Sequence, residues 1–362
     1  MGRYWQREPL LVRGAFPRFA DPLSSPEVLA LAGSEDAQSR LVRRARGRWT
    51  LEHGPFSPAK LKQLPSRDWT VLVQDTNHFS GRADELLSRF DFIPHARIDD
   101  VMVSYAVPGG TVGPHVDSYD VFLLQGHGRR RWQVSRQADR AFVPGLPLKI
   151  LRRFVPEEEW VLEPGDMLYL PPNVSHFGVA ESECLTWSIG FRAPTNEEFA
   201  KGFVDFLHER VAIQGQYRDP GAHPTAHAGA IPPHLLEHAA RTIASVRWKD
   251  ADIREFAGRF LSEPKAHVFF DKPRRAPSLA SFTAQGSRRG LALDKRSRFL
   301  FSGSMFFMNG EAVKVGGAAA RLLRRLADRR RLAGPIEAPR AFWEHVRAWH
   351  LEGFLHLAAK EE

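Results

Sequence analysis

Short runs of β-branched and aromatic residues, separated by Gly, Pro, Asn and Asp, dominate the chain between residues 97 and 192. The runs are VMVSYAV, DVFLLQ, RRWQV, WVLEPGD, MLYLPP and CLTWSIGF. Apolar runs of this length and spacing, with no helical pattern between them, are typical of several short strands. They predict a sandwich or barrel rather than alternating strands and helices.

Before and after this strand-rich region, the apolar residues follow a different, partly helical spacing. Before it, the run SPEVLALAGSEDAQSRLV predicts a helix, and residues 69–74 predict a strand. After Pro194, apolar residues at helical spacing predict helices over residues 196–211, with Asn196 as cap, over 235–248 and over 252–261, the last stopped by Pro264. The Pro- and Ser-containing stretch 271–290 is expected to be a linker or an irregular segment.

The last part of the chain combines a hairpin with helices. Asn309-Gly310 stands between two β-rich runs and favours a tight two-residue turn. A helix is expected over about 318–332, and another carries Phe342, Trp343 and Trp349. This combination predicts a winged-helix-like module.

Length and composition limit the number of domains and the class of protein. With 362 residues the chain is expected to hold two or three domains, and with 43% hydrophobic and 26% charged residues it has the composition of a folded protein. The single cysteine, Cys184, excludes an intrachain disulfide and favours a reducing compartment. No apolar run reaches the roughly 20 residues of a membrane span, and the first residues carry no signal-peptide pattern, so a cytoplasmic location is expected.

The net charge of +9 points to an anionic partner or environment. Residues 286–362 hold 15 Lys and Arg against 8 Asp and Glu, so +7 of the +9 lies there and +2 in the rest. A basic winged helix is a candidate for nucleic-acid binding. We expect this basic surface to be a solvated face of a docking module, and we do not expect direct DNA binding.

The candidate chemistry is centred on His115-Val116-Asp117 and on His176, sixty-one positions after His115. On a strand, residues two apart point to the same side, so His115 and Asp117 would share a face. With a third ligand from a neighbouring strand they would form two histidines and one carboxylate, a set that leaves open positions on Fe(II). His176 follows a strand and the turn Pro171-Pro172-Asn173, which would present it to the barrel.

Beyond these spacings, the segment SYAVPGGTVGPHVDSYDVFLLQGHGRRRW resembles the bacterial ribosomal oxygenases, enzymes with the cupin fold of JmjC-type 2-oxoglutarate oxygenases. The resemblance implies that His115, Asp117 and His176 bind Fe(II), and that 2-oxoglutarate and O₂ are cosubstrates. It also implies that Arg130 binds the far carboxylate of 2-oxoglutarate, with a hydroxyl from Ser104. Alternation supports Arg130 over its neighbours, because Arg130 would share a strand face with Trp132 and Val134.

The resemblance further implies which substrate the enzyme modifies and how its chains assemble. The substrate would be the β-carbon of an arginine in a large-subunit ribosomal protein, protein sixteen of that subunit, and the enzyme would be a homodimer. We therefore predict an α+β protein. Its parts would be a cupin-type double-stranded β-helix, or jelly roll, over residues 1–195, a helical dimerisation segment over 196–285, and a winged-helix-like domain over 286–362.

Three alternatives stay open. The same chemistry could act on a ribosomal-protein histidine, and other cupins with this triad act on asparagine or demethylate lysine. The chain could instead be a winged-helix nucleic-acid-binding protein with a non-catalytic cupin. In that case its affinity for duplex DNA would fall steeply as the salt concentration rises. His234-Leu235-Leu236-Glu237-His238 also matches the H-x-x-E-H pattern of inverted zinc peptidases, with Glu237 as base, but Pro232-Pro233 would place His234 in a frayed first turn.

Overall fold

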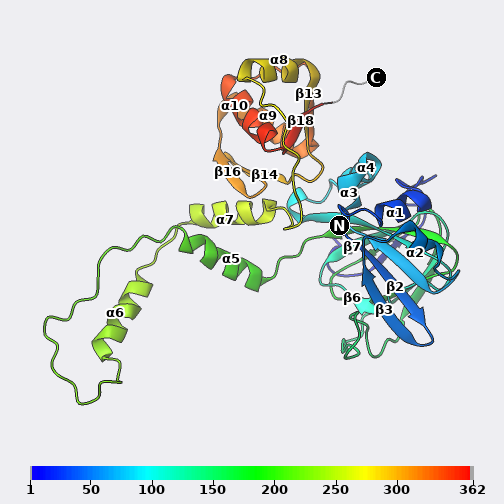
Figure 1. Ribbon diagram of the computed structural model, residues 1–362, viewed down its shortest axis with the longest axis horizontal. Coiled ribbons are helices and arrows are strands. Elements are labelled where there is room, and N and C mark those ends of the chain that lie inside the picture. Colours follow the sequence, from blue (N-terminus) through cyan, green and yellow to red (C-terminus); the bar gives the residue numbers. More distant parts are fainter. Residues whose placement is uncertain (1, 359–362) are drawn as a thin grey trace. The chain divides into compact units, whose positions relative to one another are not determined.

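The structure, a computed structural model, describes residues 2–358 and divides into two compact units between Ala193 and Pro194. The first unit is built from two antiparallel sheets, and the second from helices with two small sheets (Figure 1). Each unit has its own hydrophobic core. No helix among the described residues is long and apolar enough to cross a membrane.

The larger sheet of the first unit has eight strands in the order β1-β10-β7-β12-β5-β4-β2-β3. Its strands are β1 (Leu10–Val12), β2 (Ser39–Ala45), β3 (Arg48–His53), β4 (Trp69–Val73), β5 (Ile98–Ala106), β7 (Asp120–Gln125), β10 (Met167–Leu170) and β12 (Cys184–Phe191). Every residue of β4, β7 and β12 is buried. In β12, Leu185, Trp187 and Ile189 point into the core, and Thr186 and Ser188 alternate with them on the opposite face.

The smaller sheet has four strands in the order β6-β11-β8-β9. They are β6 (His115–Val116), β8 (Arg130–Ser135), β9 (Glu158–Leu162) and β11 (Ser175–Ala180). Val121 and Leu168 of the large sheet pack with Trp132 and Val134 of the small one in a shared apolar cluster. The two sheets thus face each other around a common interior. This confirms the sandwich or barrel that the strand spacing predicted and the cupin-type jelly roll that the resemblance implied.

Four short helices accompany the strands of the first unit: α1 (Ser25–Leu31), α2 (Pro58–Lys62), α3 (Thr76–Phe79) and α4 (Gly81–Ser88). Val28 of α1 and Leu86 of α4 pack into the core cluster that contains Trp187 and Phe191 of β12. The helix expected over SPEVLALAGSEDAQSRLV is only partly correct. It ends at Leu31, and β2 begins at Ser39.

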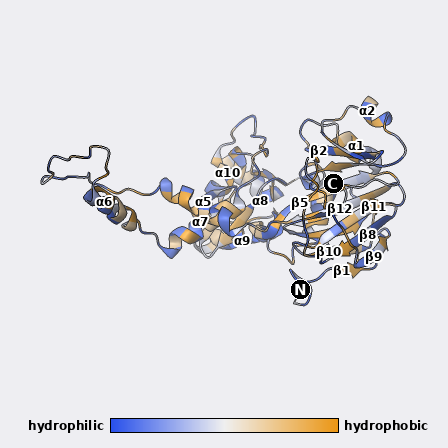
Figure 2. Ribbon diagram, turned by 90° about the horizontal axis from the view of Figure 1, so that it is seen from below, coloured by the Kyte–Doolittle hydropathy of each residue, from blue (hydrophilic) through white to orange (hydrophobic). Residues whose placement is uncertain are grey.

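The second unit begins with three helices, α5 (Asn196–His208), α6 (Pro233–Ala244) and α7 (Asp250–Ser262). The cap of α5 is Thr195 rather than Asn196, because the Thr195 hydroxyl accepts a hydrogen bond from the Glu198 amide and the Glu198 carboxylate accepts one from the Thr195 amide. Figure 2 shows mixed apolar and polar faces on α5, α6 and α7. No residue of α5 or α6 is buried within the chain.

The rest of the second unit forms a compact module around Phe282, Leu323, Phe342 and Trp349. Its elements are α8 (Leu279–Arg289), β13 (Gly290–Leu293), β14 (Phe299–Ser302), β15 (Met305–Met308), β16 (Glu311–Lys314), α9 (Gly317–Arg329), β17 (Arg331–Ala333), α10 (Arg340–Leu351) and β18 (Leu355–Leu357). Strands β15 and β16 are joined by Asn309 and Gly310, both with positive φ, as the hairpin prediction requires.

One expectation in this module is wrong. Residues 279–289 do not belong to a linker but form α8, whose Phe282 is completely buried. The Ser278 hydroxyl caps this helix by accepting a hydrogen bond from the Ser281 amide. The expected domain boundary between residues 285 and 286 lies inside α8.

Candidate metal and cosubstrate site

Three potential metal ligands, His115, Asp117 and His176, converge from the small sheet. Strand β11 pairs with β6 in a register that places His176 directly opposite His115. Asp117 does not share the strand with His115, because β6 ends at Val116, but it follows immediately and turns to the same side. The ligand atoms of all three side chains lie within 4.8 Å of one another.

The two imidazoles are oriented by the backbone. His115 Nδ1 lies 3.0 Å from the carbonyl of Gly113, and His176 Nδ1 lies 3.0 Å from the carbonyl of Val174. A carbonyl can only accept, so each Nδ1 carries the proton and each Nε2 keeps a free lone pair. These Nε2 atoms lie 3.9 Å and 3.6 Å from Asp117 Oδ2. The lone pairs and the carboxylate therefore face one common point.

Burial favours the neutral, ligating form of His176. Loss of solvent, with a smaller contribution from the neighbouring His115, lowers the pKa of His176 to about 4. Two imidazoles and one carboxylate form a mixed nitrogen and oxygen donor set without thiolate. This set suits Fe(II) with open coordination positions, so the residues present fit that ion.

Arg130 is a buried cation in the same unit. Only 3% of it is exposed, and burial lowers its pKa. Its Nη1 is 3.4 Å from Ser104 Oγ, and its Nη2 donates to the carbonyl of Gly178 at 3.3 Å. The Nε atom has no hydrogen-bond partner, and no carboxylate of the described residues pairs with this guanidinium. Such a charge requires an anion from outside the chain.

A single cavity of about 540 Å³ joins the ligand cluster to this guanidinium. His115, Asp117, His176, Arg130 and Ser104, all named from the sequence, lie along its wall. Thr186 and Ser188 of β12 line it as well. The cavity can thus accept a small dianion with one end at the ligand cluster and the other at Arg130.

Sequence reasoning missed the acidic part of this cavity. Asp99 and Asp100, at the start of β5, line it together with Tyr119 and Met102. Burial, with added repulsion from the nearby carboxylates Asp117, Asp100 and Asp99, raises the pKa of the Tyr119 phenol. A pair of aspartates at the start of a strand is a visible signal, but their direction depends on the tertiary fold. Since Arg40 and Lys149 line the cavity as well, its wall carries charges of both signs.

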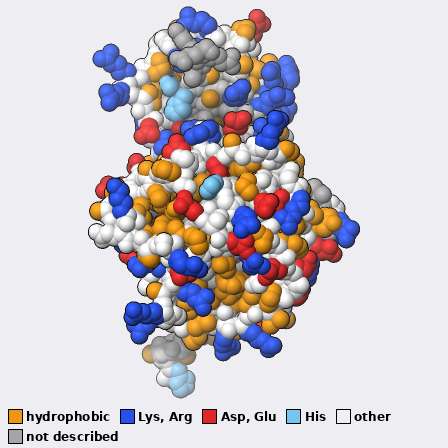
Figure 3. Space-filling view, turned by 90° about the vertical axis from the view of Figure 1, so that its right-hand side faces the viewer, with side chains coloured by type: hydrophobic (Ala, Val, Ile, Leu, Met, Phe, Trp, Pro, Cys, Tyr) orange, Lys and Arg blue, Asp and Glu red, His pale blue; other side chains and the backbone are white. Residues whose placement is uncertain are grey.

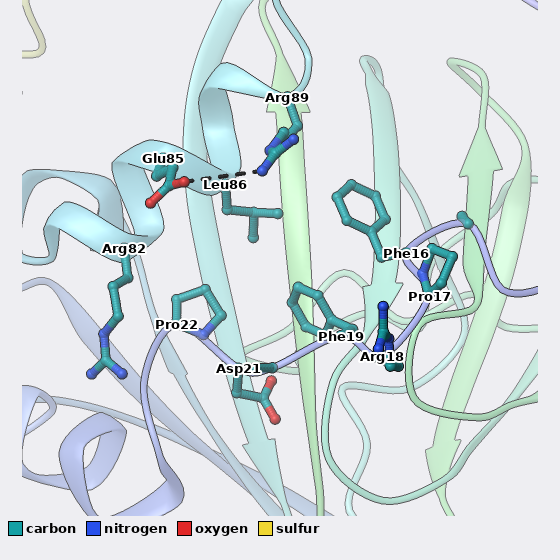
Figure 4. Close-up of a pocket in the computed structure, with 12 residues that line it drawn as sticks. Phe16, Pro17, Arg18, Phe19, Asp21, Pro22, Arg82, Glu85, Leu86 and Arg89 are labelled. Atoms are coloured by element: carbon teal, nitrogen blue, oxygen red, sulfur yellow. Dashed lines mark ion pairs between the residues drawn. The ribbon is translucent and has the colours of Figure 1, made fainter.

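A second cavity of about 640 Å³ lies between the loop 15–22 and α4 (Figure 4). Its wall combines Phe16 and Phe19 with an ion pair between Arg89 and Glu85 at 4.0 Å. No ligand cluster of the kind found around His115 occurs among the described residues of its wall. We therefore assign the candidate site to the first cavity.

The alternative zinc motif does not assemble a metal site. His234 and His238 lie on α6 and both contact the ring of Tyr217, with ring centroids 5.9 Å and 5.3 Å away. Within residues 2–358, three converging His, Cys, Asp or Glu ligands occur only in the His115 cluster. His234 stands in the first turn of α6, as Pro233 predicted.

Fold and site together define the class of JmjC-type cupin proteins, and comparison with known proteins agrees. Residues 85–199 match the JmjC domain, and residues 245–354 match the ROXA-like winged helix. The Escherichia coli ribosomal protein uL16 3-hydroxylase is 34% identical over 314 residues, which are 86% of this chain and 83% of that protein. A probable ribosomal oxygenase of Haemophilus influenzae is 40% identical over 213 residues, 57% of this chain and 52% of that protein.

Solved structures of Escherichia coli YcfD share both units. One is 32% identical with a TM-score of 0.85 and covers 98% of this chain and 96% of its own. Another, in complex with cobalt and 2-oxoglutarate, is 31% identical with a TM-score of 0.83, at the same coverage. The chain belongs to the bacterial ribosomal oxygenase family.

Proposed function

We propose that the protein is an Fe(II)- and 2-oxoglutarate-dependent dioxygenase that hydroxylates the β-carbon of an arginine in large-subunit ribosomal protein uL16. The observation that carries this proposal is the single cavity in which a His-Asp-His cluster and a buried guanidinium without a carboxylate partner among the described residues occur together. The YcfD complex with cobalt and 2-oxoglutarate supports both cofactors. The uL16 3-hydroxylase supports the substrate.

In this proposal, Nε2 of His115, Nε2 of His176 and a carboxylate oxygen of Asp117 hold Fe(II). The guanidinium of Arg130, with the hydroxyl of Ser104, binds the far carboxylate of 2-oxoglutarate by charge-assisted hydrogen bonds. When bound, iron supplies oxidation of an unactivated C–H bond, with one atom of O₂ entering the substrate and the other entering succinate as carbon dioxide is released.

The protein's own part in the reaction is positioning. Backbone carbonyls of Gly113 and Val174 hold the two imidazoles in one tautomer, so that both lone pairs point to the metal position. Asp99 and Asp100 bring negative charge to the cavity wall, which Arg40 and Lys149 also line. We prefer arginine to histidine as the substrate residue because of the resemblance to the bacterial ribosomal oxygenases, which implies an arginine target.

The test is to incubate the protein with Fe(II), 2-oxoglutarate and the ribosomal proteins of its own organism. Mass spectrometry should find one added oxygen on one arginine of uL16, and none with His115→Ala. A modified histidine in another ribosomal protein would overturn the substrate assignment and leave the chemistry. Failure to bind iron or to convert 2-oxoglutarate would overturn both.

We further propose that the protein is a cytoplasmic homodimer held together by the helical segment 196–285, with the cupin over 1–195 and the winged-helix-like domain over 286–362. The exposed apolar side chains of this segment support the dimer: Val204, Val211, Ile213, Ile231, Leu236, Ile243, Trp248, Ile253 and Phe269. The lone buried cysteine, Cys184, and a substrate that belongs to the ribosome support the location.

A further inference from the structure

The hairpin of β2 and β3 is strongly basic and stands beside the cavity. Between residues 39 and 53 it carries five arginines against a single acidic residue, Glu52, which is itself paired with Lys60 at 2.5 Å. Arg46 and Gly47 form its turn with φ of 49° and 78°, the left-handed conformation of a tight two-residue turn. Such a turn presents the flanking arginines on a rigid, narrow ribbon.

The four arginines at the end of this hairpin have no acidic partner among the described residues. Arg44, Arg46 and Arg48 are exposed, and Arg43 is half-buried. By contrast, the arginines on β8 and just after it, Arg131 and Arg136, are held by Glu159 and Glu157. The hairpin therefore concentrates uncompensated positive charge at one place on the first unit.

An aromatic ring lies within this charge. Trp49 is half-buried and stands directly opposite Arg44 in the β2–β3 register. The Arg44 guanidinium lies 5.5 Å from the centre of the Trp49 ring. A flat ring combined with guanidinium groups is the surface on which bases stack while their phosphates are neutralised.

The same face of the hairpin continues into the cavity. Arg40 and Val42 of β2 and Leu51 of β3 line the cavity wall, and by alternation Arg44 and Trp49 lie on that same face, further out. The Trp49 ring also packs near the ligand segment, since a Cβ on Gly113 would lie 3.3 Å from Trp49 Cη2. A macromolecule that reaches the cavity along this face meets the basic hairpin.

We propose that the β2–β3 hairpin, through Arg43, Arg44, Arg46, Arg48 and Trp49, binds the phosphate backbone and bases of single-stranded RNA. A lipid surface fits less well, because the hairpin end carries no large apolar anchor besides Trp49. An acidic peptide offers charge but no flat bases for the ring. The inference rests on the proposed function only for the source of the RNA, which would be the ribosomal particle that carries the substrate.

The surface is also distinct from the basic winged helix considered above. Figure 3 shows Lys and Arg side chains over both parts of the protein rather than over one alone. In the second unit, Arg321, Arg325 and Arg329 of α9 and Arg331 of β17 are exposed and likewise lack an ion pair with a described residue. They provide a control with the same number of charges.

The experiment measures binding of a fluorescently labelled oligouridine to the full-length chain by anisotropy, without metal or 2-oxoglutarate, at several salt concentrations. Replacing Arg43, Arg44, Arg46 and Arg48 by Ser should weaken binding at least tenfold at low salt. It should also lower the slope of log affinity against log salt by about 0.7 for each phosphate that the variant no longer neutralises. The variant with Arg321, Arg325, Arg329 and Arg331 replaced by Ser should bind as the unmodified protein does.

Trp49→Leu should weaken binding with the salt slope unchanged, because stacking is not a charge effect. Three results would overturn the proposal: no binding by the unmodified protein, loss of binding in the α9 variant instead, or equal competition by polyglutamate at the same charge concentration. Melting temperature and hydroxylation of an isolated substrate peptide should be unchanged in the hairpin variant. Since RNA binding is read without cofactors, it can succeed or fail independently of the oxygenase activity.

Discussion

Arg130 is the residue on which cosubstrate recognition is expected to depend. Its guanidinium is buried and pairs with no described carboxylate, so in the protein without 2-oxoglutarate its desolvation is not offset by a counter-ion. Arg130→Met should weaken 2-oxoglutarate binding to the manganese-loaded protein by roughly 10- to 150-fold, the value of a hydrogen bond to a charged group. Calorimetry measures this directly.

The same substitution should not destabilise the protein without cosubstrate. Methionine removes a buried charge at similar volume, so the melting temperature without 2-oxoglutarate should stay the same or rise. Arg131→Met is the matched control, because the Arg131 side chain is 42% exposed and is paired with Glu159 and Glu181. A large loss of stability in Arg130→Met would contradict the view that this charge is kept for a ligand.

Gly178 provides the space in which Arg130 and Trp132 lie. A Cβ at Gly178 would lie 2.6 Å from Trp132 Cζ3 and 2.8 Å from Arg130 Nε, closer than real contacts allow. We expect Gly178→Ala to displace the guanidinium and weaken 2-oxoglutarate binding at least tenfold, at the cost of about 1–3 kcal/mol of stability from overpacking.

Gly190→Ala is the control for this substitution. Gly190 also stands in a strand, but its added Cβ would meet Asp100 Oδ1 at 3.4 Å, an ordinary contact. It should bind 2-oxoglutarate as the unmodified protein does. Equal affinity in the two variants, measured by the same titration, would show that the space beside Arg130 is not needed.

At the residue scale, the sequence could predict what depends on local spacing. His115 and Asp117 are two positions apart, and alternation along β8 turned Arg130 inward, as its burial confirms. Asp99, Asp100 and Gly178 were not predicted, because their importance comes from neighbours distant in the sequence. The roles assigned to the site residues stay predictions until the variants are measured.

At the scale of elements, local chemistry also decided what could be predicted. The β15–β16 hairpin was predicted because Asn309-Gly310 strongly favours one turn type. Helix α8 was not predicted, because Pro, Ser and Arg around it are typical of a loop. The burial of Phe282 in the module's core, together with the Ser278 cap, stabilises it as a helix. Short helices depend on packing partners that a local pattern does not contain.

Asp294, which follows β13, should make the second unit sensitive to acid. Burial raises the pKa of Asp294, but hydrogen bonds from His356 and Arg296 outweigh it and hold the pKa well below the ordinary value of 3.8. A lowered pKa in the folded state gives stability that is fully present above 3.8 and is lost as the pH falls below it. Urea unfolding followed at several pH values should show this loss.

Asp294→Asn should destabilise the second unit by about 2 kcal/mol at neutral pH and should flatten its stability profile below pH 4. Asp271→Asn serves as control, since Asp271 also pairs with Arg296 but its side chain is 88% exposed, where an ion pair contributes little. An unchanged acid profile in Asp294→Asn would show that another carboxylate is responsible.

At the scale of the whole molecule, the division into a strand-rich unit and a helix-rich unit followed from the change of pattern at Pro194, and the structure divides at residues 193 and 194. The distribution of net charge along the sequence was less informative about where a binding surface lies. The C-terminal part holds most of the net charge, yet the basic hairpin that continues into the cavity wall belongs to the first unit. Net charge sums over pairs that cancel, whereas binding depends on charges left without partners.

The proposed dimer would explain the exposed apolar face of helix α6. Helix α6 has twelve residues, none of them buried, and a helix of this length is marginal in water without a packing partner. Leu236 and Ile243 stand two turns apart on one face and are 55% and 73% exposed. An exposed apolar face of this kind is typical of an interface between chains.

Light scattering of the full-length chain should therefore give about twice the 40.9 kDa of one chain. Leu236→Asp with Ile243→Asp should shift the mass to that of one chain, because two buried charges without partners are incompatible with an apolar interface. Arg241→Asp lies on the other side of α6, where Arg241 pairs with Glu237, and should leave the dimer intact. A single-chain mass for the unmodified protein, or a dimer that survives the double substitution, would exclude this face as the dimer interface.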